Sequence, residues 1–184
     1  QIGEALHNHE AASESTKPTA SEPLRILAWN VESGGNDPAV ISDQLGQLER
    51  CNIYALSEVA PANTRRYLLS TREAHGTPYD SFVSVTGGRD RLLMIYSTDR
   101  LELVETQELE AHDGVRMNSL NFRHRSPLVG HFRDKQSGEE FLLVLVHLAR
   151  GSKEVRQEQA RGLRLWAADQ DLPAIGVGDF NFDF

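Results

Sequence analysis

The sequence has 184 residues, 39% of them hydrophobic, and a formal net charge of −8 at pH 7. This is enough for one domain with a core of its own. The acidic balance gives no sign of a large basic face for gripping a phosphate backbone, although a bound cation could supply positive charge locally. The single cysteine, Cys51, excludes an intramolecular disulfide. No apolar stretch approaches the roughly 20 residues of a membrane-spanning helix.

Residues 1–23 are polar and rich in Ser, Glu and Ala, which predicts a flexible leader before a domain over residues 24–184. His7 and His9 are interpreted as part of this solvated leader and not as a metal site. The sequence starts with Gln1 and not with Met. That start fits either a trimmed polypeptide or a secreted or periplasmic protein that has lost its signal segment. The sequence decides neither the compartment nor the oligomeric state.

Strand and helix patterns alternate from residue 24 onward. The apolar run at 24–30, LRILAWN, predicts the first strand. Asp37 followed by Pro38 predicts a helix start, with Asp as the N-cap and Pro at the first helical position. A second apolar run at 51–59 predicts another strand, and residues 61–73 predict another helix.

The second half of the chain continues the alternation and predicts an α/β fold. Residues 141–148, FLLVLVHL, are almost wholly apolar, which predicts a strand buried on both faces. The other expected elements are strands at 79–85, 91–97 and 101–105, a loop at 106–121, a strand at 125–132, a turn at 134–140, a helix at 152–170 and a last buried strand at 172–178.

Four of the apolar runs end in a polar side chain. Asn30, Glu58, His147 and Asp179 take these positions, and Asn181 follows two residues after Asp179. Ligand-binding groups gather at the carboxyl ends of strands in layered α/β folds. We therefore expect these side chains to form one site.

These residue types suit phosphate chemistry. Glu58 and Asp179 are hard oxygen ligands that favour Mg²⁺ or Mn²⁺ over zinc. Asn30 and Asn181 can accept toward a metal or donate to a phosphate oxygen, and His147 can donate to a phosphoryl oxygen where negative charge builds. A metal among these groups would orient a phosphate and stabilise the charge of an in-line displacement.

Each residue also has a structural interpretation. Asn and Asp at strand ends often make turn hydrogen bonds, and a histidine after an apolar run often belongs to a core. Glu58 could be a helix-start carboxylate near the dipole of the 61–73 helix. The coincidence of all four favours a site. Arg125 fits a phosphate clamp and an ordinary surface arginine equally well.

Five stretches resemble the endonuclease/exonuclease/phosphatase superfamily of DNase I-like enzymes. They are LRILAWNVES, IYALSEV, RSPLVGHF, LVLVHLARG and GVGDFNFD, in that order, over residues 24–184. The resemblance implies a DNase I-like four-layer α/β sandwich with two central mixed β-sheets. It also implies divalent-metal-dependent hydrolysis of phosphate esters.

The resemblance assigns roles residue by residue. Glu58 matches the family's metal-binding Glu, with Asn30 beside it. Asp179 and Asn181 match the pair that orients the nucleophile and contacts the phosphate. His147 matches the histidine that contacts the phosphate near the leaving group.

Two further positions bear on the resemblance. Arg125 falls at the family's Arg-x-Pro position. The family's general-base histidine stands in a C-terminal Asp-His pair, whereas this sequence has only His112-Asp113, in the reverse order, and no histidine after His147. We therefore expect residues 24–184 to be the N-terminal part of such a domain, truncated at the Asp-x-Asn motif. We expect the isolated chain to be poorly stable and nearly inactive, since general base catalysis contributes about 10²–10⁴-fold.

Three functions remain open on these grounds. The leading one is a phosphodiesterase, most simply a nuclease acting on nucleic acid. The second is a phosphatase or phosphodiesterase of small phosphate esters, with a sugar, inositol or lipid headgroup, which the acidic charge favours. The third is a non-catalytic binding module. Residues 86–91 and 112–125 are candidate substrate contacts, although we interpret them as ordinary loops.

Overall fold

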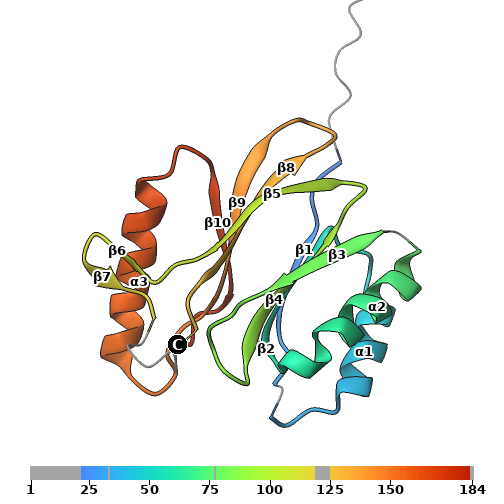
Figure 1. The fold of residues 1–184 in the computed structure, drawn as a ribbon, viewed down its shortest axis with the longest axis horizontal. Helices are drawn as coiled ribbons and strands as arrows, with labels where there is room; N and C mark the ends of the chain where they lie inside the picture. Colours follow the sequence, from blue (N-terminus) through green and yellow to red (C-terminus); the bar gives the residue numbers. More distant parts are fainter. Residues whose placement is uncertain (1–21, 33, 77, 119–124, 183–184) are drawn as a thin grey trace, which may run out of the picture.

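A computed structural model of the chain describes residues 22–32, 34–76, 78–118 and 125–182. Two four-stranded mixed sheets face each other, and helices cover their outer faces (Figure 1). The expected leader at 1–23 lies outside the described residues except for its last two positions.

The first sheet has the strand order β1-β2-β4-β3. Its strands are β1 (Ile26–Asn30), β2 (Ile53–Val59), β4 (Arg91–Ser97) and β3 (Tyr79–Val83). Strands β1 and β2 are parallel, and the other pairs are antiparallel. The helices that cover this sheet are α1 (Pro38–Gln47) and α2 (Thr64–His75), the second preceded by the 3₁₀ turn η1 (Pro61–Asn63).

The predicted start of α1 is confirmed. The Asp37 side chain accepts a hydrogen bond of 2.8 Å from the backbone N–H of Ala39, and Pro38 is the first helical residue. This cap satisfies one of the N–H groups that the first helical turn leaves without a partner.

The second sheet has the order β10-β9-β8-β5. Its strands are β10 (Ala174–Asp179), β9 (Glu140–His147), β8 (Leu128–Asp134) and β5 (Leu101–Glu108). Strands β9 and β10 are parallel. Its outer face carries α3 (Lys153–Ala168), against which a small hairpin of β6 (Ala111–His112) and β7 (Val115–Arg116) packs.

The loop expected at 106–121 is only partly correct. Strand β5 continues to Glu108, because it stays paired with β8 as far as Glu108 opposite Leu128. The hairpin β6–β7 also lies in this stretch. These residues form strands because they pair with neighbouring strands. Their side chains are mostly polar and do not alternate with apolar ones, so the sequence pattern does not predict strands here.

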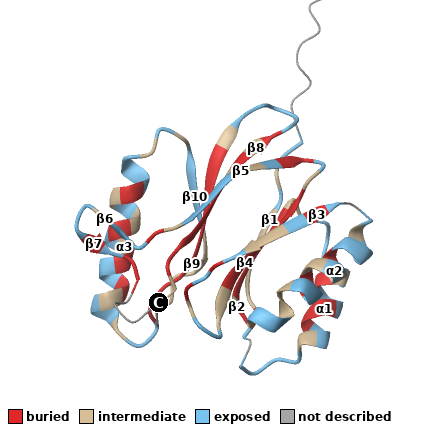
Figure 2. Cartoon of the chain, in the orientation of Figure 1, coloured by how far each residue is buried: buried red, intermediate tan, exposed pale blue. Residues whose placement is uncertain are grey.

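Three apolar clusters fill the spaces between the four layers. Strand β4 shows how alternation builds two of them: Leu92 and Met94 face the other sheet, whereas Leu93 and Ile95 face α1 and α2. Figure 2 shows the buried residues concentrated along the central strands and on one side of each helix. The expected four-layer α/β sandwich is confirmed.

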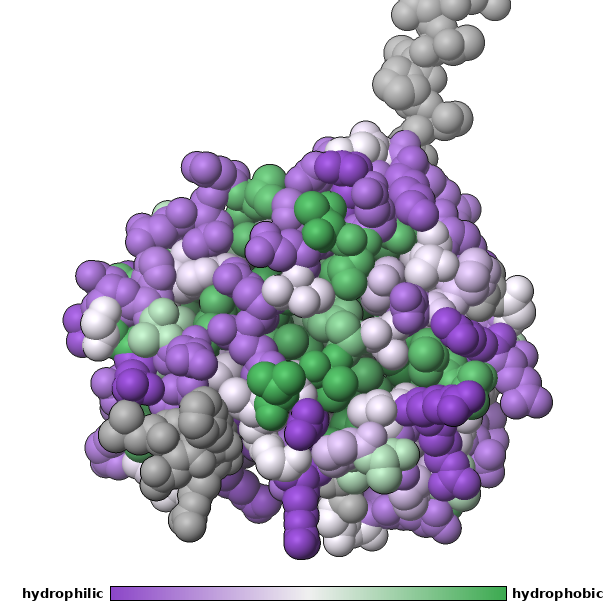
Figure 3. All heavy atoms as spheres, viewed as in Figure 1, coloured by the Kyte–Doolittle hydropathy of each residue, from purple (hydrophilic) through white to green (hydrophobic). Residues whose placement is uncertain are grey.

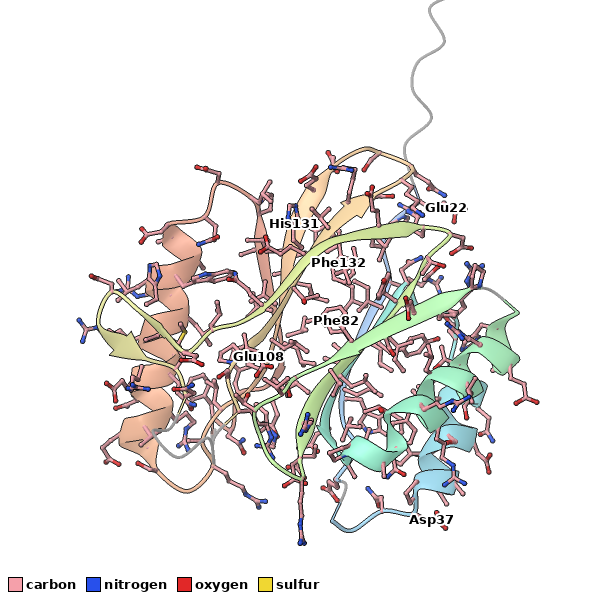
Figure 4. All side chains as sticks on the ribbon, viewed as in Figure 1. Glu22, Asp37, Phe82, Glu108, His131 and Phe132 are labelled. Carbon is pink, nitrogen blue, oxygen red and sulfur yellow. The ribbon has the colours of Figure 1, made fainter. Side chains whose placement is uncertain are left out.

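Aromatic side chains contribute to the cluster between the sheets. Phe82 from the first sheet and Phe132 from the second have ring centroids 6.2 Å apart (Figure 4). Strand β9 is buried along most of its length, as the sequence predicts. Strand β10 is not: Ile175 is 41% exposed, because β10 lies at the edge of its sheet.

The opposite edges of the two sheets are β3 and β5. Val83 and Val104 on these strands are exposed, and Figure 3 shows apolar side chains gathered along the middle of this face. Among the described residues, no helix is both long enough and apolar enough to cross a membrane.

Candidate active site

Two parallel strand pairs bring four predicted residues together. In the first sheet, Asn30 at the end of β1 lies opposite Ser57, next to Glu58. In the second sheet, His147 at the end of β9 lies opposite Asp179 at the end of β10. The two ends meet across the sandwich: Asn30 Nδ2 lies 3.1 Å from both Glu58 Oε1 and Asp179 Oδ2.

Asn30 therefore ties the two carboxylates together. Its Nδ2 donates to both, while its Oδ1 accepts a 3.0 Å hydrogen bond from the backbone N–H of Glu32. The bond to Glu32 fixes the orientation of the amide, so that nitrogen and not oxygen faces the carboxylates.

His147 completes the group. Its Nε2 lies 3.5 Å from Glu58 Oε1 and 3.8 Å from Asp179 Oδ2. The residue is only 6% exposed, and its Nδ1 has no hydrogen-bond partner among the described residues. Burial lowers the pKa of His147, and the charge of Arg125 lowers it further, against the opposing effect of the two carboxylates. Near neutral pH the imidazole is therefore uncharged and still able to donate one hydrogen bond.

A bulge aims the Glu58 side chain. The pairing of β2 with β4 shifts between Leu56 and Val59. Val59 packs in the helix-facing cluster together with Tyr54 and Leu56, so the alternation has slipped by one residue. Glu58 is the residue inside this irregularity and has a φ of 57°. Such left-handed backbone costs an ordinary residue about 1–3 kcal/mol, and it recurs at functional sites.

Gly178 and Asn181 place Asp179. Gly178 has a φ of 119°, and a Cβ there would lie 2.1 Å from the carbonyl oxygen of Val146 on β9. Only glycine fits this approach of β10 to β9. Beyond the strand, the backbone N–H of Asn181 donates to Asp179 Oδ1 at 2.9 Å, and Asn181 Nδ2 donates to the carbonyl of Leu148 at 2.8 Å.

Asp179 is held in its ionised form. Burial disfavours the charge of this carboxyl, but hydrogen bonds from Asn30 and from the backbone of Asn181 outweigh it and lower the pKa. The carboxylate is thus a charged acceptor close to His147.

Arg125 interacts electrostatically with this group. Its side chain is 15% exposed and lies 3.5 Å from the Asp90 carboxylate through Nη2. Burial lowers the pKa of Arg125, while the charges of Asp90, Glu58 and Asp179 act in the opposite direction. Arg125 is therefore a largely buried cation whose charge interacts with Glu58 and Asp179.

The oxygen-rich donor set fits a hard divalent cation. Mg²⁺ usually binds through one or two carboxylates together with waters and substrate phosphates, and Glu58 and Asp179 offer two carboxylates held by one amide. In the described part of the chain, no group of three or more His, Cys, Asp and Glu side chains is arranged to hold a metal ion.

His112 lies elsewhere. Its Nε2 is 2.8 Å from the carboxylate of Asp169, which caps the C-terminal end of α3. The N-terminal end of that helix follows the site end of β9, so His112 belongs to the far end of the layer. The adjacent His112 and Asp113 thus do not stand in for a catalytic Asp-His pair.

A cavity of about 560 Å³ lies at the opposite end of the central strands. Arg25, Arg50 and Arg100 line it together with acidic residues. Arg25 pairs with Glu49, and Arg50 with Asp99. These paired charges stabilise one another, and none of the strand-end residues reaches this cavity.

Three residues support Arg125, and of these only Glu108 lies outside the candidate contacts that the sequence pattern marked at 86–91. Asp90, Thr86 and Glu108 come from the loop before β4 and from the end of β5. A glutamate that ends LELVETQE looks like a solvated side chain, and only the fold brings it to the loop.

The sequence and the structure were compared with those of known proteins. No family profile and no curated protein matches the sequence. Among solved structures, an endonuclease/exonuclease/phosphatase family protein from Bacteroides thetaiotaomicron is 25% identical, with a TM-score of 0.66. The match covers 87% of this chain and 64% of that protein, so the chain spans less than two-thirds of its length.

Two further solved structures share the fold at lower identity. A mannosyl-6-phosphatase from Bacteroides thetaiotaomicron VPI-5482 is 22% identical, with a TM-score of 0.61, and the match covers 88% of this chain and 67% of that one. D. rerio TDP2 complexed with single strand DNA product is 21% identical, with a TM-score of 0.63, and the match covers 88% and 62%. These structures confirm the resemblance: the chain has the DNase I-like fold of the endonuclease/exonuclease/phosphatase superfamily.

Proposed function

We propose that this protein is a divalent-metal-dependent phosphoesterase that hydrolyses phosphodiester bonds, most simply a nuclease. The observation that carries the proposal is the convergence of Asn30, Glu58, His147 and Asp179 from two sheets onto one point. Residues 24–184 would form one domain of the enzyme, preceded by a leader at 1–23.

Glu58 is the proposed metal-binding residue, with Asn30 orienting its carboxylate beside that of Asp179. When bound, Mg²⁺ or Mn²⁺ would polarise a phosphoryl oxygen and neutralise its charge. Asn30 keeps both carboxylates in place through Nδ2, and the bulge in β2 directs the Glu58 side chain toward Asn30.

Asp179 is the proposed acceptor that orients the attacking water. Its lowered pKa keeps it ionised, and the loop that follows is anchored through Asn181. Because Asn181 Nδ2 already donates to Leu148, the amide holds this loop on the residue that follows β9 and leaves its second N–H for a phosphate oxygen.

His147 and Arg125 are the proposed donors to the phosphoryl group. His147 is neutral, so its N–H can stabilise a developing negative charge without a proton being lost from the site. Arg125 supplies a fixed positive charge that balances Glu58 and Asp179. Its planar guanidinium can donate to two oxygens of one phosphate.

A second candidate keeps the site and changes the substrate to a small phosphate ester. The net charge of −8 favours it, because a long polyanion would be repelled. Proteins with this fold include one solved with a single strand DNA product and one named a mannosyl-6-phosphatase. The substrate therefore has to be measured.

The test is a hydrolysis panel with the full-length protein and Mg²⁺. The panel contains supercoiled plasmid, single-stranded oligonucleotides and sugar, inositol and lipid headgroup phosphates. Wild type is compared with Asp179→Asn, and we expect cleavage of a phosphodiester that falls at least 10²-fold in the variant. Turnover of small phosphates alone would favour the second candidate. Metal binding without any turnover would instead indicate a binding module.

A further inference from the structure

The loop at 84–90, between β3 and β4, forms a seat for the Arg125 guanidinium. The carbonyl of Asp90 accepts a hydrogen bond from Arg125 Nε, and the Asp90 carboxylate lies 3.5 Å from Nη2. Gly87 has a φ of 95°, and a Cβ there would lie 2.7 Å from Arg125 Cγ. The stem of Arg125 thus passes over Gly87, where a side chain would collide with it.

Glu108, the last residue of β5, anchors this loop through its carboxylate (Figure 4). Its carboxylate accepts hydrogen bonds from the backbone N–H groups of Val85 and Thr86, the second at 3.1 Å, and from the Thr86 hydroxyl. Three donors on one carboxylate make a strong, charge-assisted anchor. None of these contacts includes a residue of the site itself.

Thr86 connects Glu108 to the backbone next to Arg125. Its hydroxyl donates to Glu108 and accepts a 2.9 Å hydrogen bond from the backbone N–H of Ser126, the neighbour of Arg125. Thr86 is 5% exposed and Ser126 is fully buried. With its proton directed at Glu108, the hydroxyl oxygen still has lone pairs free, and one of them accepts the hydrogen bond from Ser126. The backbone next to Arg125 is thereby fixed to the loop that seats its side chain.

We propose that Glu108 and Thr86 are positioning residues that lock the 84–90 loop against Ser126, so that Asp90 presents the Arg125 guanidinium to a phosphate bound beside Glu58 and Asp179. The chain of contacts runs from β5 through the loop to Arg125, whose charge interacts with Glu58 and Asp179. This inference rests on the proposed function, since it assigns Arg125 a phosphate to bind.

The test replaces the Thr86 hydroxyl and leaves the site untouched. Thr86→Val has nearly the same shape but neither donates nor accepts, whereas Thr86→Ser keeps both hydrogen bonds. In the full-length protein we expect Thr86→Val to lower kcat/KM for a phosphodiester about tenfold or more, and Thr86→Ser to stay within about threefold of wild type. In an Arg125→Ala background, Thr86→Val should change kcat/KM by less than about twofold, because the two residues act as one unit.

A structural readout separates this inference from the proposed function. The Arg125 Nε–H signal, identified by its loss in Arg125→Lys, is followed in two-dimensional ¹⁵N NMR spectra. We expect it in wild type and Thr86→Ser, and we expect it to shift or vanish through exchange in Thr86→Val and in Glu108→Gln. Glu108 is less buried than Thr86, so Glu108→Gln serves if Thr86→Val fails to fold.

The outcomes are distinct. An unchanged Arg125 signal and unchanged kcat/KM in Glu108→Gln would overturn the positioning role, and so would equal losses in Thr86→Ser and Thr86→Val. A wild-type protein that hydrolyses nothing would contradict the proposed function, whereas the NMR comparison would still test whether Glu108 and Thr86 hold Arg125.

Discussion

Gly178→Ala tests how the backbone places Asp179. The new Cβ would lie 2.1 Å from the Val146 carbonyl oxygen, whereas real Cβ contacts essentially never fall under 3.0 Å. Strand β10 must therefore move from β9 by about 1 Å, and a shift of that size can lower a catalytic rate about 10²-fold. The positive φ adds strain of about 1–3 kcal/mol, and overpacking adds a similar amount. We expect the free energy of unfolding to fall by about 2–6 kcal/mol.

Gly176→Ala is the matched control on the same strand. Its Cβ would meet Phe180 Cζ at 3.7 Å, an ordinary contact, and Gly176 has no positive φ. We expect a change within about 1 kcal/mol and nearly wild-type kcat/KM. Urea unfolding and phosphodiester hydrolysis measure both variants. If Gly178→Ala were as stable and active as Gly176→Ala, the close approach of β10 to β9 would not be what positions Asp179.

Three further substitutions test separate parts of the account. Asp134→Asn should destabilise the protein by about 3 kcal/mol at pH 7, since it leaves Arg100 buried without its charge partner. Hydrogen bonding to Arg100 lowers the pKa of Asp134, so this stabilisation exists above its ordinary pKa of about 3.9 and is lost as the pH falls through its lower folded pKa. Urea unfolding from pH 7 to pH 3 should show the difference from wild type shrinking below about pH 4, and a constant difference would refute this assignment. Asn30→Ala should lower kcat/KM about 10²-fold and raise the pKa of Asp179, which ¹³C NMR of the carboxyl can follow; an unchanged pKa would show that the amide does not hold this carboxylate. His112→Ala should leave kcat/KM within about twofold, since His112 pairs with Asp169 at the far end of α3, and a large loss would reopen its role as a base.

Much of the fold could be predicted from local patterns. The alternation of Leu92 to Met94 sets which face of β4 meets which layer, and the Asp37-Pro38 cap marks the start of α1. The neighbourhood of His147 and Asp179 could also be predicted, because parallel strands bring their carboxyl ends to one edge of a sheet. Asn30 meets Asp179 only because the two sheets pack face to face, and strand position alone does not decide that packing.

The remainder depends on contacts between distant residues. The bulge that turns Glu58 is a mismatch between β2 and β4, and no local pattern marks it. The seat of Arg125 needs Glu108 and Asp90, which are 18 residues apart in sequence, to meet a third segment. Strand β10 looks buried by composition, yet its place at the sheet edge decides its exposure.

Metal-dependent phosphodiester hydrolysis by the strand-end residues Asn30, Glu58, His147 and Asp179 is the proposed activity. The most direct measurement is the hydrolysis rate of the full-length protein against Mg²⁺ concentration, for wild type, Glu58→Gln and the control Glu73→Gln on the exposed face of α2. We predict a saturable rate in wild type and Glu73→Gln that a chelator abolishes, and a loss of at least 10²-fold in Glu58→Gln. A hydrolysis rate that changes neither with the chelator nor in Glu58→Gln would contradict metal-dependent hydrolysis at this site.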